Sequence, residues 1–132
     1  MNQESLSLEE KLHLNAKLVI EHMSKPAGFE LGFNEESVEW IDGFIERQRS
    51  QEGFEIESVR GLVNNLGSFL GVCMCEELGG EWKQQSNGQL AVEFSDGNAA
   101  FPFNKVQKQF ANGEEDSILS FYQSAAVIFR LK

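Results

Sequence analysis

The sequence predicts an α+β domain in which N-terminal helices, a central glycine-containing helix, a three-stranded antiparallel meander and two C-terminal helices follow one another. Two observations predict this order. Apolar residues keep helical spacing up to residue 78, alternate with polar residues in the segment from 81 to 103, and return to helical spacing afterwards. Runs of helices on either side of an antiparallel sheet are typical of the α+β class. The 132 residues suit a single domain spanning 1–132.

Capping signals predict two helices in the first 50 residues. Ser7 and Glu10 form the S-x-x-E pattern of a capping box, and helical spacing then continues until Pro26 and Gly28. Asn34 is a candidate N-cap for a second helix, and the two glutamates that follow it favour a helix start through the helix dipole.

A third helix is expected from about Glu57 to Leu78, over the longest apolar pattern in the chain. Gly61, Gly67 and Gly71 interrupt this pattern, although each glycine costs about 1 kcal/mol relative to alanine in a helix interior. The last two lie one turn apart on one face, so we expect another element to pack closely there. The Gly-Gly pair that follows is expected to end the helix.

Two dipeptides, Asn87-Gly88 and Asp96-Gly97, separate three short segments with strand character. The first dipeptide predicts a hairpin with a type I′ turn, because Asn-Gly tolerates the two positive φ angles of that turn. Pro102 predicts that the third segment is an edge strand or ends there, since proline cannot donate a hydrogen bond to a ladder.

Two short helices are expected at the C-terminal end. Asn104 is a candidate N-cap for the first of them, which Asn112-Gly113 would close. Asp116 is the candidate N-cap of the last helix, whose apolar positions continue to Phe129.

Composition and charge exclude several classes of protein. Hydrophobic residues make up 41% and charged residues 24%, as in soluble globular domains and unlike disordered, collagenous or membrane-embedded chains. With 21 acidic and 11 basic residues the net charge is -10, which repels nucleic acid and anionic lipid, so neither is an expected partner. No basic segment followed by an apolar core opens the sequence, which predicts a cytoplasmic protein.

Cysteines and histidines do not predict a catalytic or metal site. A disulfide between Cys73 and Cys75, one residue apart, would be strained, so two free thiols in a reducing compartment are expected. His13 and His22 are nine residues apart in one helix and face opposite sides. Phosphate-binding, nucleophile-elbow and zinc-protease motifs are absent from the sequence. We expect no enzyme, no cofactor and no metal, with a nucleophilic cysteine as the catalytic alternative.

Negative charge is concentrated in the N-terminal part of the chain, where residues 1–57 hold 13 acidic and 5 basic side chains. Glu35, Glu39, Asp42 and Glu46 recur there at helical spacing and share one face. An acidic stripe attracts a basic protein and speeds its association. The stripe therefore predicts a partner-binding surface, and the alternative is a solvated face that keeps the protein soluble.

Trp82, Phe103, Lys105 and Lys108 are the candidates for a small-ligand pocket. The two lysines share a helical face beside the end of the third strand segment, where they could hold a carboxylate or a small anion. The alternative is that they pair with the abundant acidic side chains of the chain itself.

Several segments carry a resemblance: LGSFLG (66–71), GGEW (79–82) and FPFNKVQKQFANGEEDSILSFY (101–122). They resemble a group of small, mostly uncharacterised bacterial cytosolic α+β domains with a glycine-marked helix, a G-G-x-W hairpin, and a Pro-Phe-x-Lys-Val stretch before an N-G-x-x-D-S helix start. The upstream FNEESVEWIDGFIERQR is similar to the helix before that core. A carboxylate often follows the glycine matched by Gly71, where this chain has Val72. Such domains are also similar to immunity proteins that accompany bacterial competition toxins.

These observations lead to one expected function and one alternative. We expect a non-enzymatic, immunity- or antitoxin-like inhibitor that binds and occludes a basic bacterial toxin domain through the acidic stripe. The alternative is a small-ligand-binding or regulatory domain that uses a pocket near Trp82. The sequence carries no signal for a particular oligomeric state.

Overall fold

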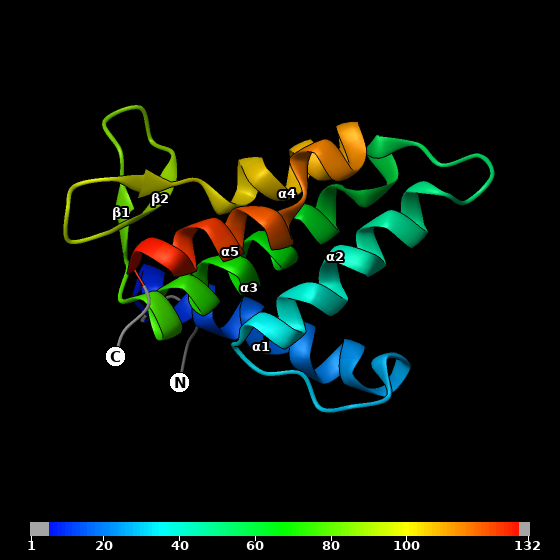
Figure 1. Ribbon diagram of the computed structural model, residues 1–132, viewed down its shortest axis with the longest axis horizontal. Coiled ribbons are helices and arrows are strands. Elements are labelled where there is room, and N and C mark those ends of the chain that lie inside the picture. The colour runs from blue at the N-terminus through cyan, green and yellow to red at the C-terminus, as the bar shows by residue number, and fades with distance from the viewer. Residues whose placement is uncertain (1–5, 130–132) are drawn as a thin grey trace.

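A computed structural model describes residues 6–129 and shows an α+β fold with the expected order of elements (Figure 1). The elements are α1 (Leu8–Ala27), α2 (Glu35–Arg49), the 3-10 helix η2 (Ile56–Val59), α3 (Arg60–Leu78), β1 (Glu81–Gln84), β2 (Leu90–Glu93), β3 (Ala99–Ala100), α4 (Pro102–Asn112), the 3-10 helix η3 (Gly113–Asp116) and α5 (Ile118–Phe129).

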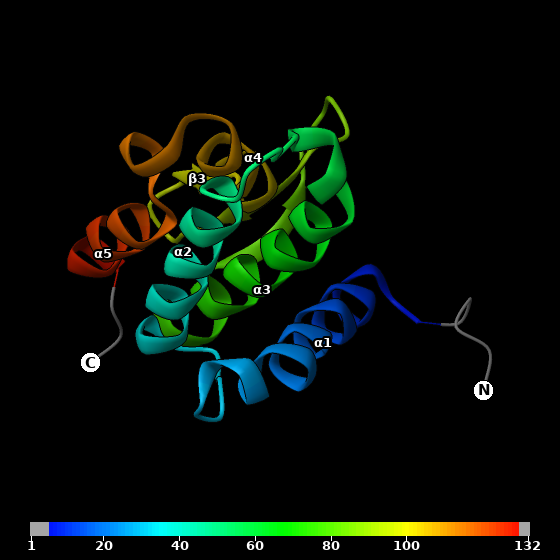
Figure 2. The ribbon, with the colours of Figure 1, turned by 90° about the vertical axis from the view of Figure 1, so that its right-hand side faces the viewer.

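Helix α3 lies at the centre of this arrangement. Figure 2 shows α1 on one side of α3 and α4 on the opposite side, and α2 packs against α5. The small sheet lies at one end of the helical layers (Figure 1). Residues from every layer therefore meet on α3, which explains why its apolar pattern is the longest in the chain.

The two N-terminal helices begin where the capping signals predict. Ser7 Oγ accepts a hydrogen bond from Glu10 N–H, and the Glu10 carboxylate accepts one from Ser7 N–H, so the capping box is confirmed. Pro26 lies inside the last turn of α1, which ends at Gly28 in the left-handed conformation. Asn34 caps α2 by accepting a hydrogen bond from Ser37 N–H.

The expected close approach to the glycine face of α3 is confirmed at two of the three glycines. A Cβ on Gly67 would collide with the Phe103 ring, and a Cβ on Gly71 would collide with the Trp82 ring. A Cβ on Gly61 would meet nothing within 4 Å. Phe103 of α4 and Trp82 of β1 therefore occupy the space that the two missing side chains leave, and their ring centres lie 5.9 Å apart.

The three strands form one antiparallel sheet in the order β1-β2-β3. The hairpin expected at Asn87-Gly88 is confirmed, but its type I′ turn is wrong, because only Gly88 has a positive φ. Gln85 N–H donates to the Gln89 carbonyl and Gly88 N–H donates to the Gln85 carbonyl. The loop is thus a three-residue connection that ends in a left-handed glycine.

The second loop repeats the first. Phe94 N–H donates to the Asn98 carbonyl, Gly97 N–H donates to the Phe94 carbonyl, and Gly97 again has a positive φ of 88°. In both loops the residue before glycine accepts a hydrogen bond from the backbone two residues on, here Asp96 from Asn98. Ser-Asn-Gly and Ser-Asp-Gly are therefore two copies of one turn chemistry.

β3 is an edge strand, as expected, but it ends at Ala100, so the expected continuation of the strand to Phe103 is wrong. Pro102 is instead the first residue of α4, because proline is well suited to the first turn of a helix. The two N-caps expected near the C-terminal helices are also wrong. Asn104 consequently lies inside α4 and caps nothing. Asp116 belongs to η3, and the N-cap of α5 is Ser117, whose Oγ accepts a hydrogen bond from Ser120 N–H.

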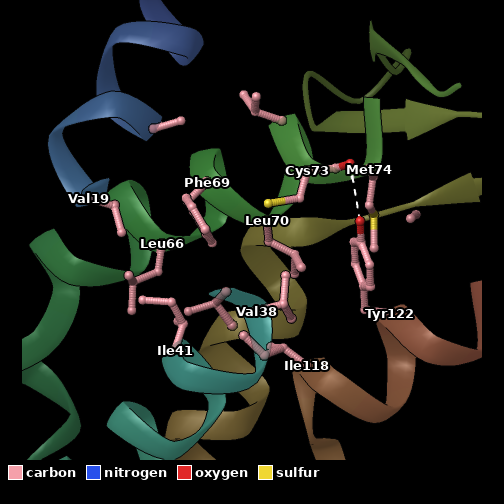
Figure 3. Packing of buried hydrophobic residues seen from close by; sticks show 14 of the residues in the cluster. Val19, Val38, Ile41, Leu66, Phe69, Leu70, Cys73, Met74, Ile118 and Tyr122 are labelled. Carbon is pink, nitrogen blue, oxygen red and sulfur yellow. Dashed lines mark hydrogen bonds between the residues drawn. The ribbon is translucent and has the colours of Figure 1, made fainter. Parts of the chain in front are cut away.

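The hydrophobic core is centred on the buried face of α3 (Figure 3). Phe69 and Leu70 of α3 pack there with side chains from α1, α2 and α5, such as Val38 and Ile118. Tyr122 of α5 is fully buried. Its hydroxyl is in hydrogen-bond contact with two acceptors on α3, the Cys73 carbonyl and the Glu77 carboxylate. Helix α5 is thereby tied to α3 by polar as well as apolar contacts.

Candidate functional site

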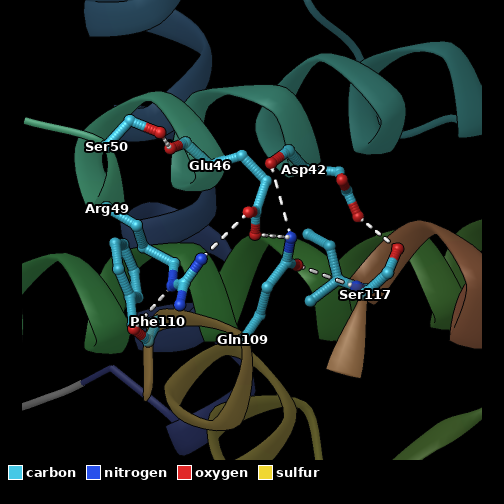
Figure 4. Close-up of polar contacts among 8 residues, drawn as sticks. Asp42, Glu46, Arg49, Ser50, Gln109, Phe110 and Ser117 are labelled. Atoms are coloured by element: carbon cyan, nitrogen blue, oxygen red, sulfur yellow. Dashed lines mark hydrogen bonds and ion pairs between the residues drawn. The ribbon is translucent and has the colours of Figure 1, made fainter. Parts of the chain in front are cut away.

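The acidic stripe expected on α2 is largely an interhelical seam rather than a free surface. Asp42 Oδ2 accepts hydrogen bonds from the Ser117 hydroxyl and from Leu119 N–H, at 3.0 Å for the latter. Figure 4 shows Asp42 and Glu46 pointing from α2 toward Ser117 and Gln109. Asp42 therefore binds the start of α5.

Glu46 is also engaged within the fold. Its carboxylate accepts a hydrogen bond from Gln109 Nε2 at 3.0 Å and forms an ion pair with Arg49 at 3.1 Å. Gln109 is fully buried, and its Oε1 accepts a hydrogen bond from Ile118 N–H. Arg49 also donates to the Phe110 carbonyl. This network joins α2, α4 and α5 (Figure 4), so it has a structural role in holding three helices together.

The other two residues of the stripe lie nearer to solvent. Glu35 accepts a hydrogen bond from Gln123 at 3.3 Å, whereas Glu39 is exposed. Glu39 lines a surface cavity with Trp40, over whose ring the Arg47 guanidinium lies, 5.1 Å from the ring centre. The chain itself thus supplies a cation to the aromatic ring beside Glu39.

The four candidates for a small-ligand pocket do not share one cavity in the described part of the chain. Trp82 and Phe103 are in ring contact, but Lys105 pairs with Asp116 at 3.3 Å and lies 5.4 Å from the centre of the Phe121 ring. Lys108 is exposed. The hydrogen bond from Asn112, together with Lys105, lowers the pKa of Asp116. The alternative for the two lysines is pairing with acidic side chains of the chain itself, and this alternative is confirmed for Lys105, which pairs with Asp116.

A different group of carboxylates surrounds Trp82. A cavity of about 210 Å³ lies between the start of α1, the end of α3 and β1, and we call it the acidic pocket. It is lined by Glu9, His13, Val72, Cys75, Glu76, Gly80, Glu81 and Trp82. No lysine or arginine belongs to this lining, as far as the structure describes it.

The three glutamates of the acidic pocket are exposed and have no hydrogen-bond or ion-pair partner among residues 6–129. They act together on the thiol of Cys75. Burial raises the pKa of Cys75 to about 12, and the negative charges of Glu9, Glu76 and Glu81 add to this effect. The Cys75 thiol thus lies close to three negative charges, and the pocket lining has no lysine or arginine to offset them.

Adjacent glutamates at the end of α3 have opposite roles. Glu76 faces the acidic pocket, whereas Glu77 accepts a hydrogen bond from the buried Tyr122 hydroxyl. Sequence reasoning does not connect Glu9 with Glu81, because 72 positions separate them. The usable signal is the glycine face of α3, which predicts that another element packs there. In the structure Trp82 of β1 packs on this face at Gly71.

The carboxylates of the pocket are suited to pairing with an ammonium or guanidinium group. His13 is in ring contact with Phe33, at 5.3 Å between ring centres, and its pocket neighbours are carboxylates and a protonated thiol. Across residues 6–129, no group of three or more His, Cys, Asp or Glu side chains is arranged to hold a metal ion. In the same part of the chain, no helix has the length and apolar character needed to cross a membrane.

Comparison with protein-family models, curated proteins and solved structures finds no match to this chain. The resemblance to small bacterial domains and to immunity proteins therefore stays a prediction.

Proposed function

We propose that this protein is a non-enzymatic binding protein whose acidic pocket receives a lysine or arginine side chain of a basic protein partner. The observation that carries the proposal is the set of three unpartnered carboxylates, Glu9, Glu76 and Glu81, around a cavity that also includes Trp82. Carboxylates pair with the cationic head, and aromatic rings attract cations.

The net charge supports the same role at longer range. A chain with a net charge of -10 accelerates its encounter with a positively charged surface. Asp42 and Glu46 of the stripe on α2 are engaged in contacts within the fold. We therefore propose the acidic pocket, rather than this stripe, as the docking site. The most concrete form of the function is an inhibitor that occludes a basic toxin domain, in keeping with the resemblance to immunity proteins.

Nuclear magnetic resonance tests the pocket with a defined probe, Nα-acetyl-arginine amide. We expect it to shift the indole N–H resonance of Trp82, and added salt to weaken its binding. Nα-acetyl-citrulline amide, which has nearly the same shape but no charge, is the control ligand. Equal shifts with both ligands would show that charge is not recognised.

Matched triple variants separate the pocket from the overall charge. E9Q/E76Q/E81Q removes the three carboxylates of the pocket and should weaken binding of the arginine probe about tenfold, the sum of three exposed charge pairs. The control variant E21Q/E30Q/E52Q removes three exposed carboxylates elsewhere and should bind as the unaltered protein does. Equal weakening in both variants would contradict the proposal.

The same two variants test the inhibitor form. We expect a basic partner that is captured at low salt to be released by about 0.5 M salt, as screening of exposed charges requires. The pocket variant should fail to capture that partner, whereas the control variant should retain it. If the pocket variant captures the partner as well as the unaltered protein does, the partner binds another surface.

A further inference from the structure

A second open site lies beside Phe103, whose ring contacts Trp82, and it shares no lining residue with the acidic pocket. Two neighbouring cavities of about 290 and 520 Å³ share Asn64 and Phe103 in their walls, and together we call them the Phe103 groove. The first turns of α3 and α4 form its sides, and the β1–β2 loop closes one end. Their volumes are in the range of sites that bind small ligands or peptide segments.

Apolar side chains stand at both ends of the groove. Ile56 and Val63 line the larger cavity, and Leu90 and Phe101 line the smaller one. The groove therefore offers two apolar subsites with Asn64 between them. In an extended peptide, side chains two residues apart lie about 6.6 Å apart on one face, so neighbouring subsites suit such a pair.

Amide side chains line the groove between and beside these subsites. Asn64, Asn104 and Gln107 have no side-chain hydrogen bond within the part of the chain that the structure describes. A carboxamide carries both a donor and an acceptor, as a peptide group does. The three amides are thus able to pair with the N–H and C=O groups of an extended main chain.

The groove is electrically neutral on a strongly acidic protein. Its two charged lining residues, Glu57 and Arg60, form an ion pair with 3.0 Å between Arg60 Nε and the Glu57 carboxylate. No unpaired charge is therefore available among its lining residues to select a charged ligand. A sugar would also bond to amides, but a groove with an apolar subsite at each end and its carboxylate engaged is better suited to a peptide.

We propose that the Phe103 groove binds an extended, uncharged peptide segment with apolar side chains at alternate positions. Two such side chains fill the subsites of Ile56 and Phe101, and the main chain between them hydrogen-bonds to Asn64 and Gln107. This site is independent of the acidic pocket, because its ligand carries no cation.

The probe is a pool of acetylated, amidated pentapeptides Gly-Φ-Ser-Φ-Gly, in which Φ is Leu, Val or Phe. We expect the pool to shift the side-chain amide resonances of Asn64, Asn104 and Gln107, and to leave the backbone amide resonance of Glu9, in the acidic pocket, in place. A pool in which Ala replaces Φ is the control. Equal shifts from the alanine pool, or no shift from either pool, would overturn the proposal, as would shifts from maltotriose without shifts from the peptides.

N64A/Q107A removes two of the amides at exposed helix positions, where alanine favours the helix. We expect it to weaken peptide binding about tenfold, the loss of two hydrogen bonds. Q48A/Q51A removes two amides that do not line the groove and should bind normally. Normal binding by N64A/Q107A would overturn the proposed main-chain recognition. Binding of the arginine probe should be unchanged in both variants, which separates this site from the acidic pocket.

Discussion

Trp82 lies directly over Gly71, with its six-membered ring in the space that a side chain at position 71 would occupy. This contact joins β1 to α3 and positions Trp82 in the wall of the acidic pocket. The glycine is therefore a requirement of packing, and its cost in helix propensity is offset by the burial of an indole ring against the helix backbone.

Replacing Gly71 by alanine should lower the free energy of unfolding by about 1–3 kcal/mol, because a Cβ there forces the Trp82 ring to move. Urea denaturation measures the change. Gly61→Ala is the matched control in the same helix, since a Cβ at that position meets nothing within 4 Å. Alanine there should stabilise the protein by about 0.5–1 kcal/mol through helix propensity. Equal effects of the two substitutions would contradict the packing explanation.

The sequence predicts this part of the fold well because local signals and packing agree. The capping box at Ser7 and the left-handed glycines depend on a few neighbouring residues, which sequence patterns capture. The errors lie where two local signals compete. Pro102 suits both a strand end and the first turn of a helix, and Ser117 and Asp116 are both good N-caps. Tertiary contacts decide between them, since Asp116 pairs with Lys105.

Asp42→Ala should destabilise the protein by about 2–3 kcal/mol, because it leaves the Ser117 hydroxyl and Leu119 N–H without their charged acceptor. Thermal or urea unfolding measures this loss. Glu39→Ala, on the same helix but exposed, should change stability by less than about 0.5 kcal/mol. A small effect at Asp42 would mean that the seam between α2 and α5 contributes little to folding.

Helical periodicity alone could not separate these two acids. Asp42 and Glu39 both belong to a stripe of one chemical kind, and the difference between them arises from α5, which is about 75 residues further along the chain. The acidic pocket is beyond sequence reasoning for the same reason. Its carboxylates come from three elements, and only the packing of α1 and β1 against α3 brings them together.

Cys75 should react slowly with iodoacetamide in the native protein. Its pKa is raised to about 12 from an ordinary value near 9, so its thiolate is scarce at pH 8. The higher nucleophilicity of a more basic thiolate offsets part of this effect, which leaves an expected rate about 30-fold below that of an ordinary thiol. Tandem mass spectrometry assigns the label to position 75 or 73.

Substitutions in the acidic pocket provide the control for that measurement. Glu76→Gln should lower the pKa of Cys75 and accelerate its alkylation, because one of the negative charges that oppose the thiolate is removed. Glu21→Gln, on an exposed part of α1 outside the pocket, should leave the rate unchanged. A rate that is the same in Glu76→Gln and in the unaltered protein would show that burial alone protects the thiol.

Alkaline pH should destabilise the fold through the same two cysteines. Burial, reinforced by Glu77, raises the pKa of Cys73 well above its ordinary value, and the pKa of Cys75 is about 12. Above pH 9 the unfolded chain releases the thiol protons while the folded chain retains them, so the folded state binds more protons and its stability falls as pH rises. Each thiol contributes a slope of up to about 1.4 kcal/mol per pH unit. Urea denaturation between pH 9 and 11 should therefore show a shallower decline for Cys75→Ala than for the unaltered protein, and parallel declines would exclude Cys75 as a source of the pH dependence.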